Sequence, residues 1–272
     1  MTLTSPLIMG IINATPDSFS DGGAYEPLAQ ARKLIAEGAD VLDIGGESTR
    51  PGAEPVSVHE EIRRVVPLIE AIRAEWDGGI SIDTLKPEVA RAAFQAGATI
   101  WNDVAALTYS PESLETAAAL GGQVILMHMK GEPRTMQVAP HYDDVVSEVE
   151  AYLLMRAEAA MAAGVRRQDI WLDPGIGFGK NLEHNLKLIR ATERLSSHGF
   201  PLLMAASRKR FIAALEERDG GTTSAATERL GGTIAVHLYA ADRGAKMLRV
   251  HDVQAMRQAL RLRDALKCDR DV

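Results

Sequence analysis

The sequence has 272 residues and a formal net charge of −7, with 46% hydrophobic and 25% charged residues. This composition is close to the average of globular domains, so it argues against a disordered chain and against a membrane protein. The negative charge disfavours broad electrostatic binding to nucleic acid or acidic lipid. The single cysteine, Cys268, has no partner for a disulfide or a cysteine-rich zinc site. The first apolar stretch, 7–12, is short and has no basic residue before it, so we expect no signal peptide and a cytoplasmic protein.

Short apolar stretches of strand length alternate along the whole chain with longer segments in which apolar residues recur three or four positions apart. The expected strands are 7–12, 41–44, 79–82, 99–101, 123–127, 170–172, 201–205 and 246–249. The expected helices are 28–37, 58–75, 87–96, 113–120, 144–163, 183–196, 227–243 and 252–266. Such alternation is typical of parallel βα units. Eight strands and eight helices predict an α/β fold, a TIM (β/α)8 barrel, as a single domain over residues 1–272.

A polar residue stands at the end of every expected strand. In chain order these residues are Asn13, Asp43, Asp83, Asn102 with Asp103, His128, Asp173, Ser207 with Lys209, and Arg249 with His251. One aspartate after a strand is often only a helix cap or a turn residue. TIM barrels, however, build their sites at the C-terminal ends of their strands, so we expect these side chains to converge on one rim.

The residue types in this ring point to a ligand with two unlike ends. Asp83 and Asp173 are suited to a flat ring that presents adjacent N–H groups, as a 2-amino-pyrimidinone edge does, and Asn102 adds a matching amide. The cations that could bind a phosphate or pyrophosphate group are Arg50, Arg208, Lys209, Arg249 and His251. The sequence therefore predicts an anionic heterocycle as the ligand.

Two long segments closely resemble the signature loops of bacterial dihydropteroate synthases, a family of pterin-binding TIM-barrel enzymes. They are MGIINATPDSFSDGG at 9–23 and DIGGESTRPG at 43–52. Shorter matches follow in the family's order at 81–84, 102–104, 127–129, 173–180, 207–209 and 249–252. The resemblance covers about the whole chain. One departure is Ala205, where the family commonly has glycine, and we expect the extra methyl group to be tolerated.

The resemblance implies an activity and a set of site residues. The activity is condensation of 6-hydroxymethyl-7,8-dihydropterin pyrophosphate with p-aminobenzoate, a step of folate biosynthesis. The implied pterin-binding residues are Asp83, Asn102, Met127, Asp173 and Lys209. The implied pyrophosphate-binding residues are Asn13, Thr49, Arg50, Arg249 and His251, and Asn13 is also the implied ligand of Mg²⁺. The implied p-aminobenzoate-binding residues are Ser48, Thr49, Arg50, Pro51, Phe178, Ser207 and Lys209.

Among these residues, the implied catalytic ones are Asp83, Lys209, Arg249 and His251. The resemblance also implies a homodimer whose partners are small-molecule substrates, without nucleic acid or membrane. Two other functions stay open. A pterin-dependent methyltransferase domain would keep the pterin carboxylates but would have no use for the segment 48–52. A non-catalytic pterin-binding protein could keep the barrel without turnover, although the presence of Asn13, Arg50, Lys209 and His251 argues against it.

Overall fold

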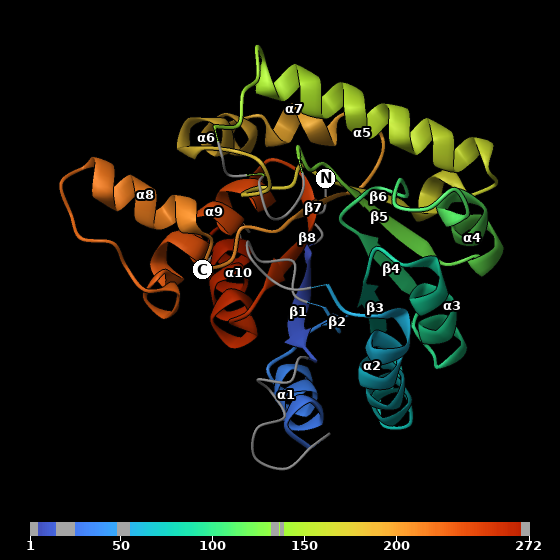
Figure 1. Ribbon diagram of the computed structural model, residues 1–272. Coiled ribbons are helices and arrows are strands. Elements are labelled where there is room, and N and C mark those ends of the chain that lie inside the picture. Colours follow the sequence, from blue (N-terminus) through green and yellow to red (C-terminus); the bar gives the residue numbers. More distant parts are fainter. Residues whose placement is uncertain (1–4, 15–24, 48–54, 132–135, 137–138, 268–272) are drawn as a thin grey trace.

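The computed structural model describes residues 5–14, 25–47, 55–131, 136 and 139–267. Eight parallel strands close into a barrel in the order β1 to β8 (Figure 1). They are β1 (Leu7–Asn13), β2 (Val41–Gly45), β3 (Gly79–Asp83), β4 (Ile100–Asp103), β5 (Gln123–Met127), β6 (Ile170–Asp173), β7 (Leu202–Met204) and β8 (Ala245–Val250). The prediction of a TIM barrel is therefore confirmed. That the same domain takes in every residue of 1–272 stays a prediction, because the described ranges leave gaps.

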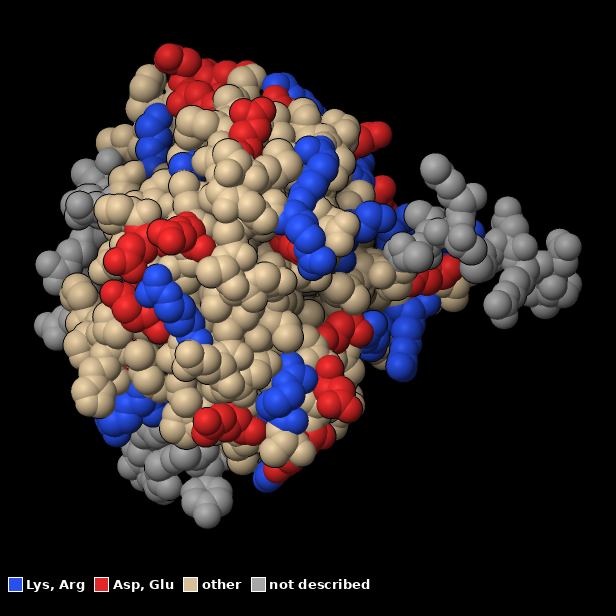
Figure 2. Space-filling model, turned by 90° about the vertical axis from the view of Figure 1, so that its right-hand side faces the viewer, with Lys and Arg blue, Asp and Glu red and all other residues tan. Residues whose placement is uncertain are grey.

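Helices follow one another round the outside of the barrel in chain order (Figure 1). They are α1 (Tyr25–Ala36), α2 (Val58–Arg73), α3 (Pro87–Gln95), α4 (Ser113–Leu120), α5 (Val145–Ala162), α6 (Leu182–Arg190), α7 (Thr192–Ser196), α8 (Arg210–Arg218), α9 (Leu230–Asp242) and α10 (Val253–Lys267). Within the described residues, no helix has the length and apolar character needed to cross a membrane. Basic and acidic side chains are interspersed on the face of the molecule in Figure 2.

Two helical predictions differ from the structure. The expected helix 183–196 is two helices, α6 and α7, because the backbone leaves helical geometry at Ala191 and the Thr192 hydroxyl donates to the Ile189 carbonyl at 2.6 Å. Helix α8 was not expected. It is only nine residues long, and its buried residues, Phe211, Ile212 and Ala213, directly follow one another, so the segment is too short for a repeat to mark it as a separate helix.

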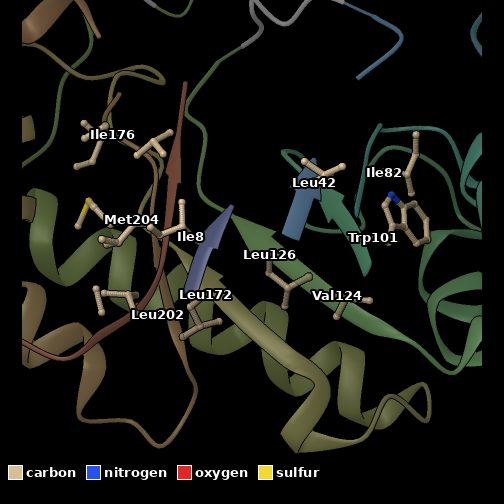
Figure 3. Packing of buried hydrophobic residues seen from close by; sticks show 14 of the residues in the cluster. Ile8, Leu42, Ile82, Trp101, Val124, Leu126, Leu172, Ile176, Leu202 and Met204 are labelled. Carbon is tan, nitrogen blue, oxygen red and sulfur yellow. The ribbon is translucent and has the colours of Figure 1, made fainter. Parts of the chain in front are cut away.

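The strands are apolar on both faces because each face meets a different buried layer. Side chains that point outward, among them Ile8, Leu42 and Ile82, belong to a large buried cluster that also contains residues of the helices. Figure 3 shows several of these strand side chains. Side chains that point inward form a separate cluster inside the barrel. Its members are Met9, Val41, Ile100, Ile125, Trp171, Leu203, Ala205 and Met247.

Polar side chains lie directly above this inner apolar cluster. Successive side chains of a strand point to opposite faces, so the residue two positions after an inward residue also points inward. Two positions after Val41, Ile100, Ile125, Trp171 and Met247, the chain has Asp43, Asn102, Met127, Asp173 and Arg249. The inward-pointing residues are thus apolar in one layer of the barrel interior and mostly polar in the next layer, at the C-terminal ends of the strands.

We predict that the layer between strands and helices carries most of the stability. Leu42→Ala should lower the free energy of unfolding by about 2–5 kcal/mol, because it opens a cavity where the side chain is fully buried. Leu262→Ala, at a position 63% exposed, should change it by no more than about 0.5 kcal/mol. Urea denaturation of both variants measures the difference, and equal effects would contradict this assignment of the core.

Candidate active site

Four predicted pterin-binding residues lie on neighbouring strands at the C-terminal end of the barrel. Asp83 on β3 is the register partner of Asn102 on β4, and Met127 on β5 is the register partner of Asp173 on β6. Asn102, Met127 and Asp173 are almost completely buried. All four residues lie within their strands, Asn102 one position before the end of β4 and the other three at the last position, so the barrel ladder itself fixes where their side chains begin.

Lys209, the fifth of that predicted set, begins α8 across the rim. Its ammonium donates to the Ile176 carbonyl and lies 4.5 Å from the centre of the Phe178 ring. Burial lowers the pKa of Lys209 to about 8, although the nearby Asp173 carboxylate acts in the opposite direction. Burial also raises the pKa of Asp173, against the effect of Lys209. The Lys209 ammonium and the Asp173 carboxylate are therefore close enough to influence each other's charge.

Arg249 bridges two carboxylates inside the barrel. Its Nε donates to Oδ2 of Asp43 at 2.6 Å, and its Nη2 donates to Oδ2 of Asp83 at 2.7 Å. These carboxylates raise the pKa of Arg249 and outweigh the opposing effect of burial. The sequence placed Arg249 with pyrophosphate and Asp83 with the pterin, whereas here the two side chains are paired with each other. Contact between Arg249 and pyrophosphate stays a prediction.

The pKa of the Asp83 carboxyl group is far above the usual value for aspartate. Burial raises its pKa to about 7; Arg249 acts to lower that value and the Asp43 charge to raise it. A carboxyl with a pKa near neutrality changes its hydrogen-bonding role within the physiological pH range, because only the ionised form is purely an acceptor.

The loop after β6 is held tightly against the loop after β5. Gly175 and Gly179 have φ values of 66° and 63°, and a Cβ there would lie 2.0 Å from the His128 carbonyl oxygen and 2.3 Å from that of Lys130. Only glycine permits so close an approach at these angles. The loop ends at Lys180, whose Nζ donates to the carbonyls of His128 at 3.2 Å and Phe178 at 2.9 Å. This arrangement places the Phe178 ring beside Lys209.

Lys180 was not recognised as a structural residue from the sequence. Its Nζ also lies 3.0 Å from Nδ1 of His128, a ring that burial keeps neutral by lowering its pKa to about 3. Burial lowers the pKa of Lys180 itself to about 7. The glycine-rich segment before it was the available signal, since such a loop needs an anchor for its carbonyl groups.

Ser207 and His251 meet at the other side of the rim. The Ser207 hydroxyl lies 2.9 Å from Nδ1 of His251 and accepts from the His251 backbone N–H at 3.2 Å. Arg208, one of the expected phosphate-binding cations, forms a two-point ion pair with Asp252. Asn13, Arg208 and His251 line a cavity of about 660 Å³ that extends between α1 and α10.

Asn13 has the properties of a ligand in a magnesium site that contains few protein side chains. It ends β1, its residue is exposed, and an amide oxygen is a donor that Mg²⁺ accepts. In the described part of the chain, no three His, Cys, Asp or Glu side chains are grouped to hold a metal ion. Mg²⁺ commonly takes only one or two protein ligands and completes its octahedron with water and substrate phosphates, so this donor set suits it.

A buried ion cluster lies outside the predicted site residues and was also missed. Lys86 Nζ donates to Glu61 at 2.6 Å, to the Val56 carbonyl at 2.7 Å, and to Glu47. Burial alone would lower the pKa of Lys86, but its bonds to Glu47 and Glu61 raise it. The cluster therefore ties Glu47 to Val56. The predicted residues Ser48, Thr49, Arg50 and Pro51, which come between these two, lie outside the described residues.

We predict that Lys86→Met lowers the free energy of unfolding by about 3–5 kcal/mol, because Glu61, only 1% exposed, is left buried without its counter-ion. Adding Glu61→Leu to Lys86→Met should restore part of the loss, and Arg218→Met at an exposed pair should have little effect. Urea denaturation measures all three. If the double variant is less stable than Lys86→Met, the unpaired Glu61 charge is not the cause.

The chain was compared with known proteins. Residues 9–251 match the family described as "Pterin binding enzyme". The dihydropteroate synthase of Escherichia coli (strain K12) is 45% identical over 269 residues, which cover 97% of this chain and 93% of that protein. Two solved structures of the same name are similar. One, from Xanthomonas albilineans with 4-aminobenzoic acid, has a TM-score of 0.89, is 48% identical, and is aligned over 98% of this chain and 95% of that one.

The other solved structure is from Yersinia pestis, in complex with a sulfonamide drug. It has a TM-score of 0.90, is 40% identical, and is aligned over 98% of this chain and 96% of that one. The resemblance noted from the sequence motifs is confirmed by these matches over nearly the whole chain. The protein therefore belongs to the family of pterin-binding enzymes, among the dihydropteroate synthases.

Proposed function

We propose that this chain condenses 6-hydroxymethyl-7,8-dihydropterin pyrophosphate with p-aminobenzoate, and that 7,8-dihydropteroate and pyrophosphate are the products. The observation that carries the proposal is the polar layer at the C-terminal end of the barrel. There Asp83, Asn102 and Asp173 supply hydrogen-bond acceptors on the strands β3, β4 and β6, and Lys209 supplies a cation. The relatives that are named dihydropteroate synthase support the proposal.

The pterin would bind through its polar edge. Ionised carboxylates accept hydrogen bonds only, so Asp83 and Asp173 suit the N–H groups of a 2-amino-pyrimidinone ring. Lys209 can donate to the carbonyl oxygen or a ring nitrogen, and Met127 offers a polarizable side chain for the ring face. Arg249 already donates to Oδ2 of Asp83, so in this proposal the pterin shares the Asp83 carboxylate with Arg249 or displaces it.

Bond cleavage requires stabilisation of negative charge on the leaving group. The C–O bond of the pterin methylene breaks, and its electron pair leaves with pyrophosphate. Asn13 and His251, together with Thr49, Arg50 and Arg249, are the proposed pyrophosphate-binding residues. Mg²⁺ held by Asn13 would neutralise charge on the pyrophosphate oxygens. The positive charge left on the methylene spreads into the pterin ring, where Asp83 and Asp173 stabilise it electrostatically.

Bond formation needs orientation more than proton abstraction. The amine of p-aminobenzoate is an uncharged nucleophile at neutral pH; its lone pair forms the new C–N bond, and the nitrogen then loses one proton to water or to the departing pyrophosphate. Holding the amine in line is the main requirement. Phe178, Ser207 and Lys209 lie near the rim, and we propose that they bind p-aminobenzoate together with Ser48, Thr49, Arg50 and Pro51.

The direct test is an assay with dihydropterin pyrophosphate, Mg²⁺ and p-aminobenzoate. We expect one dihydropteroate and one pyrophosphate for each pterin consumed. Asp83→Asn and Asp173→Asn should fold but lose pterin affinity, because an amide nitrogen repels a donor that the carboxylate accepts. Pterin binding without product would favour a non-catalytic protein, and methyl transfer from a methylated folate would favour a methyltransferase.

Assembly and location are also proposals. We propose a homodimer on the strength of the family resemblance, and Leu262 and Leu266 of α10, 63% and 79% exposed, are apolar side chains that a second copy could cover. We propose a cytoplasmic location on the same basis. The proposed partners are the small-molecule substrates, without nucleic acid.

We predict a bell-shaped pH dependence of kcat/KM for the pterin substrate. Below about pH 7 Asp83 takes up a proton and is no longer purely an acceptor, so kcat/KM should fall as pH falls. Above about pH 8 Lys209 loses its charge, so kcat/KM should fall as pH rises. Steady-state rates from pH 5.5 to 9.5 measure both limbs. An acidic limb that stays unchanged in Asp83→Asn would assign that titration to another group.

We predict that sulfonamides inhibit this protein by competing with p-aminobenzoate. They present an arylamine with a polar group at the far end of the same ring, so a pocket for p-aminobenzoate should accept them, and the Yersinia pestis relative is known in complex with such a drug. Rates at several p-aminobenzoate concentrations distinguish the cases. Inhibition that excess p-aminobenzoate does not relieve would place the drug elsewhere.

A further inference from the structure

Asp43 is a fully buried carboxylate to which the proposed reaction assigns no role. It lies in the middle of β2 and points into the barrel, directly above the inner apolar cluster. Its Oδ2 accepts two hydrogen bonds, from Nε of Arg249 at 2.6 Å and from Nδ2 of Asn102 at 3.1 Å. A buried charge is costly even when it is paired, so a carboxylate kept at this position calls for a reason beyond packing.

The contact between Asp43 and Asn102 determines which end of the Asn102 amide is available to a ligand. An amide group has an acceptor oxygen at one end and a donor nitrogen at the other, and it can turn to present either one. A carboxylate accepts only, so Asn102 must turn Nδ2 toward Asp43. The acceptor Oδ1 is then the end that remains for a ligand. Arg249 donates to the same oxygen of Asp43, so this carboxylate faces donors from two sides.

We propose that Asp43 is a positioning residue for substrate selection, which holds Asn102 so that its carbonyl oxygen meets the heterocycle. This inference rests on the proposed function, in which Asn102 contacts the pterin. The contacts run across the barrel from Arg249 on β8 to Asp43 on β2 and from Asp43 to Asn102 on β4. In the proposal, Asn102 in turn contacts the substrate.

The arrangement selects for a heterocycle with an N–H group at the point that Asn102 touches. A ring with a nitrogen lone pair there would face another acceptor and would be rejected, because two acceptors leave each other unpaired at a buried position. Without Asp43, Asn102 could rotate and serve either kind of ring. Asp43 would thus act on specificity without touching the substrate.

An exchange of the two side chains tests the proposal. In Asp43→Asn the new amide can accept from Asn102 or donate to it, so the orientation of Asn102 is no longer imposed. In the double variant Asp43→Asn with Asn102→Asp, the amide at 43 donates to the carboxylate at 102, whose other oxygen is again an acceptor for the ligand. Ser81→Ala is the matched control, since Ser81 is the register partner of Asp43, is equally buried, and has no bond to Asn102 or Arg249.

Calorimetry with 6-hydroxymethyl-7,8-dihydropterin, which is the substrate's heterocycle without pyrophosphate, measures the effect on binding. Asp43→Asn should weaken binding by about tenfold or more, and the double variant should recover most of that loss, while Ser81→Ala should bind as the parent protein does. In steady-state assays, KM for the pterin substrate should rise in Asp43→Asn, while KM for p-aminobenzoate should change by less than about twofold.

Two results would overturn the inference while the proposed function stands: unchanged pterin binding in Asp43→Asn, or a loss that the double variant does not reverse. The second result would mean that Asp43 acts only through the charge of Arg249 or through packing. Failure of the parent protein to bind the pterin would instead contradict the proposed function, and the inference with it.

Discussion

Charge inside a protein must be paired, and this constraint organises the whole upper half of the barrel. Three carboxylates, those of Asp43, Asp83 and Asp173, lie on the strands directly above the apolar cluster inside the barrel. Arg249 pairs with the first two, and Lys209 lies close enough to Asp173 that each shifts the other's pKa. No packing requirement explains so many ionisable groups in one layer, because apolar residues of similar size would avoid their desolvation. A ligand that uses the charges does explain them.

The scaffold separates stability from chemistry by position along each strand. The inner apolar cluster and the layer under the helices are apolar. The inward residues two positions after that inner cluster, toward the C-terminal ends of the strands, are mostly polar. Loops then fix what the strands do not. Lys180 holds the glycine-rich loop that carries Phe178, and Lys86 joins Glu47 to Val56 on either side of a predicted substrate-binding segment. Both anchors are buried lysines, whose several N–H donors suit places where backbone carbonyls or carboxylates converge.

The barrel and the position of the site could be predicted from the sequence, because both follow from local periodicity. Alternating strands and helices indicated the barrel, and the polar residue that ends each strand indicated the rim of the site. Pairings between distant residues could not be predicted in this way. Arg249 and Asp43 are 206 positions apart, and only closure of the barrel brings them together. Lys86 precedes a helix-starting proline, a setting that gives no sign of its buried partners. The break at Ala191 is accompanied by a hydrogen bond from the Thr192 side chain, which apolar periodicity does not reveal.

The central claim is that the charged layer is kept for the ligand and not for stability. The combined variant Asp43→Leu, Asp83→Leu, Asn102→Leu and Arg249→Met tests it most directly, because it replaces the bridged charges, and the Asn102 amide that donates to Asp43, with apolar side chains. The claim predicts a free energy of unfolding in urea equal to that of the parent or higher, by up to about 4 kcal/mol, with loss of pterin binding. A fall of more than about 2 kcal/mol, well beyond the effect of most neutral replacements, would show that the bridge holds the barrel together and would contradict the claim.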